Sequence, residues 1–155
     1  DILSKNIKNL TLTIVGEGES RSRLEELVTL KGLQNIVRFT GRVTDAVKAQ
    51  LLAKSWVMIQ PSTMEGWGIT AIEANAAGTP VVASDVPGLR DSVNNPHTGI
   101  LVPARNAEKF AQKIALIIKD EKVRSELEQG GLRWSKRFSW KASGEALLSI
   151  VQSQK

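Results

Sequence analysis

Short apolar runs alternate with longer stretches of helical pattern along the whole chain of 155 residues. The runs are rich in Val, Ile and Leu with few polar interruptions, which is typical of parallel strands that helices cover on both faces. Strands of this kind, separated by helices, predict an α/β fold with a doubly wound, Rossmann-like parallel sheet. We expect about five strands, at 10–16, 35–41, 56–62, 80–85 and 99–103.

The stretches between these runs carry apolar residues at helical spacing. In 106–120 an apolar stripe begins at Phe110 and continues on one face, as in a helix that packs on a core. The stretch 69–77 is apolar nearly all round, so we expect that helix to be buried. No Pro/Ser-rich linker divides the chain, and the sequence therefore predicts one domain over 1–155.

Composition bounds the class of protein. Hydrophobic residues make up 41% of the chain and charged residues 24%, which suits a soluble domain with its own core. No apolar run is long enough to cross a membrane, and the N-terminus lacks the pattern of a signal peptide. Cysteine is absent, which excludes disulfides and thiolate metal sites and fits a cytoplasmic location. A single histidine, without a His/Asp cluster, gives no reason to expect a metal.

The formal net charge of +5 favours anionic partners, which include nucleic acid, acidic lipid and phosphorylated ligands. Nucleic-acid binding is not expected, because no aromatic residues are interleaved with Lys and Arg and no known module signature is present. A basic cluster near the C-terminus indicates either contact with acidic lipid or, more commonly, a solvated helix face. The cluster consists of Arg133, Lys136, Arg137 and Lys141.

Two glutamates stand out in the otherwise apolar stretch PSTMEGWGITAIEANAAGTPVV at 61–82. Glu65 follows the third predicted strand, and ligands of doubly wound folds bind at the carboxyl ends of the strands. The glycines on either side of Trp67 let backbone N–H groups at the following helix start approach an anion. Glu73 lies on that helix, and the face that it shares by helical spacing consists of Ile69, Thr70, Ala76 and Ala77. From spacing alone, the two carboxylates either face water or bind the hydroxyls of a ligand.

These residues also resemble those of a known family. The stretch PSTMEGWGITAIEANAAGTPVVASDVPGL is similar to the E-x7-E region of retaining glycosyltransferases of family four, which have the GT-B fold. LTIVGEGESRSRLEELVTLKGLQNIVRFTGRVTD resembles the stretch of that family from its second strand onward. HTGILVP resembles its last strand and RFSWKASGEALLSIV its closing helix, so the resemblance covers essentially the whole chain in order.

The resemblance implies that the chain is the C-terminal half of a GT-B fold and binds a nucleotide-diphosphate sugar. Glu73 would accept hydrogen bonds from the ribose hydroxyls. Glu65, the implied catalytic residue, would face the donor sugar near its anomeric carbon. Arg42 and Val43 would line the base of the nucleotide. The other implied donor-binding residues form the turn that opens the helix, namely Gly66, Trp67, Gly68, Ile69 and Thr70.

The implied function is transfer of a sugar, with retention, to a glycan, lipid-linked or small-molecule acceptor, as in polysaccharide biosynthesis. Neither a metal nor a cofactor is expected. The implied partners are the nucleotide-sugar donor and an acceptor held by an N-terminal domain. The protein would act in the cytoplasm, with peripheral contact at the inner face of the membrane if the basic cluster contacts lipid. The alternative is a non-catalytic module that binds nucleotide sugars.

Two parts of the family pattern have no match in these residues. One is the acceptor domain, and the other is the strand and loop that open the donor domain and carry an Arg and a Lys for the diphosphate. We therefore expect a fragment that does not transfer sugar by itself. In the family the missing strand lies between the strands that match 10–16 and 56–62. The gap that its absence would leave between these two strands, which we call the slot, is expected either to hold a second polypeptide or to close.

The chain also departs from the family at single positions. Trp67 stands where Phe is usual, and it is the only tryptophan expected within reach of a donor. Asn75 stands where the family often has an apolar residue, which puts a polar amide on a helix that we expect to be buried. The other tryptophans, Trp56, Trp134 and Trp140, are expected to pack in the core.

Overall fold

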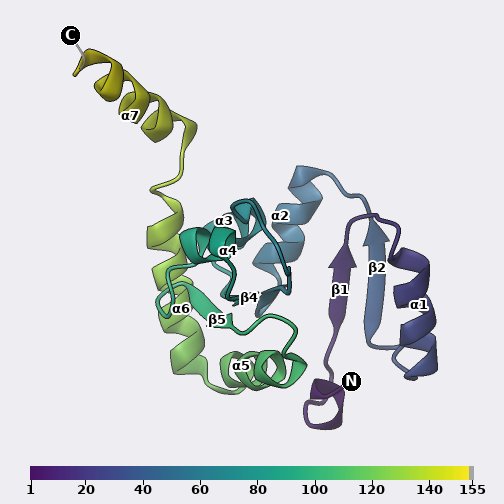
Figure 1. Cartoon of the computed structure of the whole chain (residues 1–155). Helices are drawn as coiled ribbons and strands as arrows, with labels where there is room; N and C mark the ends of the chain where they lie inside the picture. The colour runs from purple at the N-terminus through teal and green to yellow at the C-terminus, as the bar shows by residue number, and fades with distance from the viewer. Residues whose placement is uncertain (154–155) are drawn as a thin grey trace. The chain divides into compact units, whose positions relative to one another are not determined.

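The structure is a computed structural model that describes residues 1–153, with the side chains of Trp140 and Ala146 outside that description. The chain forms two compact units, Asp1–Leu51 and Leu52–Lys155, each with secondary structure of its own (Figure 1). The expected core position of Trp140 concerns a side chain outside the described part. The single nucleotide-sugar-binding domain over 1–155 stays a prediction.

The first unit contains a two-stranded parallel sheet. Strands β1 and β2 pair with Ile14 opposite Phe39, and α1 forms the connection that a parallel pair requires. Among the described residues of this unit, no apolar side chain is fully buried, because two strands and two short α-helices cover little surface. Its elements, in chain order, are η1 (Leu3–Lys5), β1 (Leu12–Val15), α1 (Arg21–Leu30), β2 (Val37–Gly41) and α2 (Asp45–Ala53), whose end reaches the second unit.

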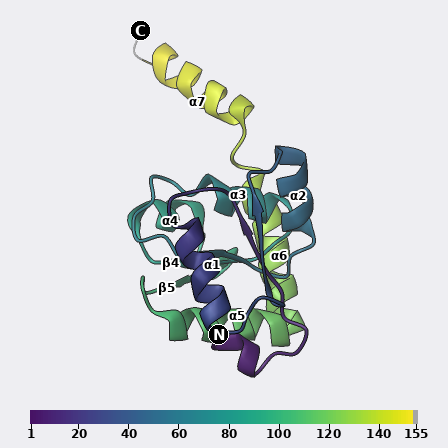
Figure 2. The same cartoon turned by 90° about the vertical axis from the view of Figure 1, so that its right-hand side faces the viewer.

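The second unit contains a three-stranded parallel sheet in the order β3, β4, β5, with Val81 opposite both Met58 and Gly99. In both views α3 and α4 lie on one side of β4 and β5, and α5 lies on the other (Figure 1, Figure 2). The elements are β3 (Met58–Gln60), α3 (Ile69–Ala76), β4 (Val81–Ser84), α4 (Pro87–Ser92), β5 (Gly99–Val102), α5 (Ala107–Lys119), α6 (Glu121–Ser135) and α7 (Trp140–Gln152).

The core of the second unit is built around β4, whose four residues are all buried. Small side chains of α3, Ala71 and Ala74, pack on the strand together with Leu89 of α4. Ile117, on the apolar stripe of α5, is also fully buried. The small residues of α3 let this helix lie close to the strand, and at the start of the helix Gly68 lies against Leu89 and Ser92 of α4.

The predicted fold class is confirmed, because five parallel strands alternate with helices. The prediction that α3 is buried holds for one face only, formed by Ala71, Ile72, Ala74 and Asn75, because Ile69, Thr70 and Ala76 are exposed. The strands form two sheets, and in the described residues no pairing joins β1 to β3. The two outcomes expected for the slot, occupation by a second polypeptide and closure of the two strands, both stay predictions.

One tryptophan prediction is wrong. Trp56 is 56% exposed, because it lies just ahead of β3. The guanidinium of Arg124, on α6, covers its ring at 4.5 Å from the ring centroid, so the tryptophan makes a cation–π contact at the surface. Trp134 is half-buried. Over residues 1–153, no helix has both the length and the apolar character needed to cross a membrane.

Candidate functional site

Glu65 is held in place by polar residues at the end of β3. Its Oε2 accepts hydrogen bonds from Nε2 of Gln60, at 3.0 Å, and from the hydroxyl of Ser62, at 3.2 Å. The Gln60 amide also donates to the Ser62 hydroxyl, at 3.3 Å, so the three side chains form one network. Both bonds to the half-buried carboxylate use the same oxygen, and among the described residues Oε1 has no donor. The carboxylate is therefore oriented while one oxygen stays available to a ligand.

Residues 66–68, which we call the glycine turn, connect Glu65 to α3. Gly68 is buried and has the left-handed φ of +75°, which favours glycine over all other residues. A Cβ at this position would lie 2.6 Å from Cδ2 of Leu89 and 2.8 Å from Oγ of Ser92. Gly68, the N-cap of α3, has no side chain that could accept from the first turn, so backbone N–H groups there lack a side-chain cap. Such a start is suited to an anion.

The backbone of helix α4 packs closely against the glycine turn. A Cβ at Gly88 would overlap the carbonyl oxygen of Glu65 and would lie 2.6 Å from that of Gly66. Only a glycine allows this close approach of the two backbones. Arg90 of the same helix donates from Nε to Oδ1 of Asp85 at 2.6 Å, and this hydrogen bond with its charge attraction raises the pKa of Arg90. The pair joins α4 to the end of β4.

Glu73 is half-buried on α3, one helical turn after Ile69. The neighbours that α3 buries lie on its other sides, at Ala71, Ile72, Ala74 and Asn75. The exposed or half-buried residues of α3 and its C-cap are the face expected for Glu73, namely Ile69, Thr70, Ala76 and Ala77. Both glutamates therefore belong to the same segment, one on each side of the helix start.

The buried amide of Asn75 has a structural role. Its Nδ2 donates to the carbonyl oxygen of Thr98 at 3.0 Å and more weakly to that of Thr79 at 3.4 Å. A Cβ at Gly131 of α6 would lie 3.0 Å from this nitrogen, so the glycine makes room for the amide. The polar residue on a buried helix is explained, because it satisfies carbonyl groups that an apolar residue would leave unpaired.

The family model of glycosyl transferases group 1 matches residues 1–134. The chain belongs to this family. The resemblance expected from the E-x7-E region is thereby confirmed, and the solved structures that this group 1 chain matches are GT-B enzymes, of which it covers a C-terminal part.

Three known proteins illustrate the similarity of this group 1 chain. It is 33% identical over 128 residues to a D-inositol 3-phosphate glycosyltransferase of Streptomyces bingchenggensis, with 83% of the chain and 28% of the relative covered. Sucrose-phosphate synthase from Thermosynechococcus elongatus superposes with a TM-score of 0.84 and 32% identity, covering 93% and 38%. Anabaena HepE in complex with UDP-glucose gives 0.86 and 26%, covering 96% and 42%. The chain thus spans 28% to 42% of the length of these relatives.

The second unit of this group 1 chain brings together most of the predicted site residues, which lie between the end of β3 and the end of α3: Glu65, Gly66, Trp67, Gly68, Ile69, Thr70 and Glu73. Arg42 and Val43 belong to the first unit, between β2 and α2, and are exposed and half-buried respectively. Over the described residues, no group of three His, Cys, Asp or Glu side chains is placed to hold a metal ion.

Sequence reasoning missed the residues that support the site. Gln60 is the last residue of β3 and Ser62 follows it by two positions, and their polarity at the end of an apolar run is a signal that was available. No sequence feature marked Gly88, which stands in the tripeptide Pro-Gly-Leu that opens α4. A close approach between backbones that are far apart in the chain leaves no local sequence pattern.

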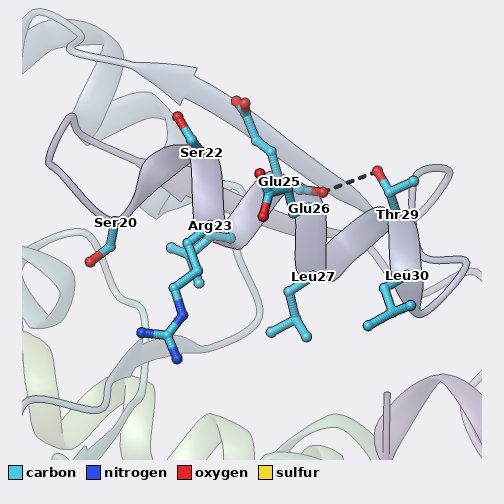
Figure 3. A pocket seen from close by; sticks show the side chains of 9 residues that line it. Ser20, Ser22, Arg23, Glu25, Glu26, Leu27, Thr29 and Leu30 are labelled. Carbon is cyan, nitrogen blue, oxygen red and sulfur yellow. Dashed lines mark hydrogen bonds between the residues drawn. The ribbon is translucent and has the colours of Figure 1, made fainter.

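The first unit has a surface depression of its own along α1 (Figure 3). Arg23, Leu27 and Leu30 point to the same side of the helix, and Leu30 is 84% exposed. The Thr29 hydroxyl donates to the carbonyl oxygen of Glu25, in the same helix, at 3.1 Å. The lining comes from a single helix with mixed charges, and nothing in it indicates a ligand.

Proposed function

We propose that the second unit binds the diphosphate and sugar of a nucleotide-sugar donor and that the whole protein is a retaining glycosyltransferase. The observation that carries this proposal is the oriented carboxylate of Glu65 next to the glycine turn that opens α3. A carboxylate accepts hydrogen bonds from sugar hydroxyls, and uncapped helix amides donate to phosphate oxygens. The two lie at opposite ends of the segment 65–69, as the two ends of a sugar diphosphate require.

The arrangement suits the charge that develops when the anomeric C–O bond breaks. Positive charge grows on the sugar and negative charge on the departing diphosphate. Glu65 would stabilise the sugar side, and the amides of the glycine turn would stabilise the phosphate side. Groups that are oriented before the reaction often supply the largest part of the rate enhancement. In this proposal the leaving phosphate helps to deprotonate the acceptor on the same face of the sugar, and no metal takes part.

We also propose which residues bind the nucleotide end of the donor, from their positions in the chain. Glu73 would accept hydrogen bonds from the ribose hydroxyls, one helical turn into α3. Arg42 and Val43 of the first unit would line the base, largely through backbone groups. Because HepE, a solved relative, binds UDP-glucose, UDP is the first nucleotide to test.

The acceptor and the place of action are proposed more broadly. Glycans, lipid-linked glycans and small molecules are all candidate acceptors, and the Streptomyces relative is named for D-inositol 3-phosphate. The side chains of the basic cluster are all exposed, which suits peripheral contact with acidic lipid at the cytoplasmic face of a membrane as well as a solvated helix face.

A titration of the full-length protein tests the donor site. UDP, GDP and ADP, with their glucose or mannose conjugates, are titrated by calorimetry into the wild type and into Glu73→Gln. We expect one nucleotide to bind and Glu73→Gln to weaken it roughly tenfold, because a charge-assisted hydrogen bond is lost. The matched control is Glu126→Gln, which removes the same charge from an exposed position of α6.

Two outcomes would contradict the proposal. The site is refuted if no nucleotide binds to the full-length protein. The role of Glu73 is refuted if both variants weaken binding equally, because the effect is then one of net charge. Binding without sugar transfer to any acceptor of the panel would favour the non-catalytic binding module.

A further inference from the structure

Three aromatic rings connect the glycine turn to the chain between α6 and α7. The rings of Trp67 and Phe138 meet edge to face, with centroids 5.1 Å apart and planes at 66°. Phe138 meets Trp134 in the same way, with centroids 5.2 Å apart and planes at 72°. Edge-to-face contact is the preferred geometry for such pairs. The middle ring, Phe138, therefore touches both tryptophans.

The far end of this aromatic group is firmly held. Nε1 of Trp134 donates to the carbonyl oxygen of Ser92 at 2.9 Å, and Arg137 covers its ring at 4.8 Å from the centroid. The backbone N–H of Phe138 donates to the carbonyl oxygen of Ser135 at 3.0 Å, which fixes the ring to the end of α6. Ser92 ends α4, the helix that also supports the glycine turn.

At the near end, Phe138 is the only aromatic side chain among the described residues whose ring meets that of Trp67. Of the residues in the glycine turn, only Trp67 has a side chain, and glycine backbones lose the most freedom when they are ordered. The backbone of the turn rests on α4 through Gly68 and Gly88, but contacts of this type exclude other conformations only on one side. The Trp67 ring is the part of the turn that can be held by attraction.

We propose that Phe138 is a positioning residue for the sugar-nucleotide site. By holding the ring of Trp67, it keeps the glycine turn in the conformation that presents its amides to the donor. Phe138 itself lies after α6, some seventy residues further along the chain than Trp67. The inference rests on the proposed function for its consequence in donor binding, but the ordering of the turn by Phe138 does not.

If Phe138 only packed in the fold, its substitution would change donor affinity and stability in a different pattern. Phe138 is half-buried, and neither it nor its two partners belongs to the fully buried core around β4. Phe110 of α5, in contrast, is 8% exposed and belongs to the buried core residues. Phe138→Leu and Phe110→Leu thus remove the same ring from a position that touches the turn and from one that does not.

The first experiment measures UDP-glucose affinity and the midpoint of thermal unfolding of the full-length protein. We expect Phe138→Leu to weaken UDP-glucose roughly three- to tenfold, the amount that corresponds to one lost edge-to-face contact. Phe138→Tyr keeps the ring and is expected to stay within about twofold of the wild type. Phe110→Leu is expected to lower the unfolding midpoint at least as much as Phe138→Leu while leaving the affinity unchanged. Equal affinity losses in the two Leu variants would overturn the inference.

A double-mutant cycle tests whether Phe138 acts through Trp67. Trp67→Leu, Phe138→Leu and the double variant are compared for UDP-glucose affinity. We expect the double variant to have about the same UDP-glucose affinity as the single variant that binds less tightly, because both changes break the same contact. Additive losses would show that Phe138 does not act through Trp67.

Hydrogen exchange separates failure of this inference from failure of the proposed function. Without ligand, the amides of 64–70 in Phe138→Leu are expected to exchange roughly three- to tenfold faster than in the wild type, because the turn opens more often. The control Phe110→Leu should leave this segment unchanged. Faster exchange in a protein that binds no nucleotide would refute the proposed function alone. Unchanged exchange would refute the role of Phe138, whatever the ligand.

Discussion

At the scale of single residues, the site depends on how one carboxylate is oriented. A glutamate in a surface loop samples several rotamers, and each must be given up when a ligand binds. Gln60 and Ser62 remove much of this freedom by donating to the same oxygen of Glu65. The identity of Glu65 was predictable from the motif, because the E-x7-E pattern is local. The donors that orient it were not predicted, although they lie within five residues.

The network around Glu65 leads to a prediction about catalysis. In the full-length protein, Gln60→Leu is expected to lower kcat/KM roughly tenfold, because a hydrogen bond to a charged group is lost and the carboxylate reorients. Initial rates with the donor found by titration measure this change. Gln129→Leu is the matched control, since the Gln129 amide donates only to the Ser125 hydroxyl, at 3.5 Å on the exposed side of α6. Equal rates for both variants would contradict the orienting role of Gln60.

At the scale of elements, α3 has two tasks with opposite requirements. Its start must be open to a ligand, and the face that carries Ala71 and Ala74 must be buried on β4. The glycine turn meets the first requirement, and the small alanines meet the second. The burial of one face of α3 was predictable from its apolar composition, but the exposure of Ile69, Thr70 and Ala76 was not. Its tie to the chain before β5 through Asn75 was not, because the partner carbonyl lies 23 residues away.

This tie predicts a loss of stability. Asn75→Leu is expected to destabilise the protein by about 1–3 kcal/mol, because the buried carbonyl of Thr98 loses its donor. The change appears as a lower midpoint of thermal unfolding, measured by calorimetry. Gln112→Leu, on the exposed side of α5, is the control and is expected to leave the midpoint nearly unchanged. A midpoint for Asn75→Leu equal to that of the wild type would show that the carbonyl finds another donor.

At the scale of the whole molecule, the two units differ in how much apolar surface they bury. The fully buried apolar residues of the described chain all lie in the second unit, around β4. The first unit has a two-stranded sheet and helices that bury no residue fully, so it buries little apolar surface to offset the conformational entropy lost on folding.

The difference predicts that backbone amides of the first unit are less protected against hydrogen exchange than those of the second. In the chain 1–155, the amides of β1 and β2 are expected to exchange with solvent at least roughly tenfold faster than those of β4, because they open with less loss of burial. Hydrogen exchange read by mass spectrometry measures the ratio, with exchange in denaturant as the reference. Equal protection in the two units would contradict the prediction and would indicate that the whole chain unfolds in one step.

The sequence by itself determined the five strands, the helices between them and the family. These features follow from periodicity and from one contiguous motif, both of which are local in the chain. Only the tertiary structure decided that the strands form two sheets, that Trp56 is exposed, and that Gly88, Ser92 and Phe138 surround the glycine turn. Contacts of this second kind join residues that are far apart in the chain, so they depend on how the elements pack, and no local pattern encodes them.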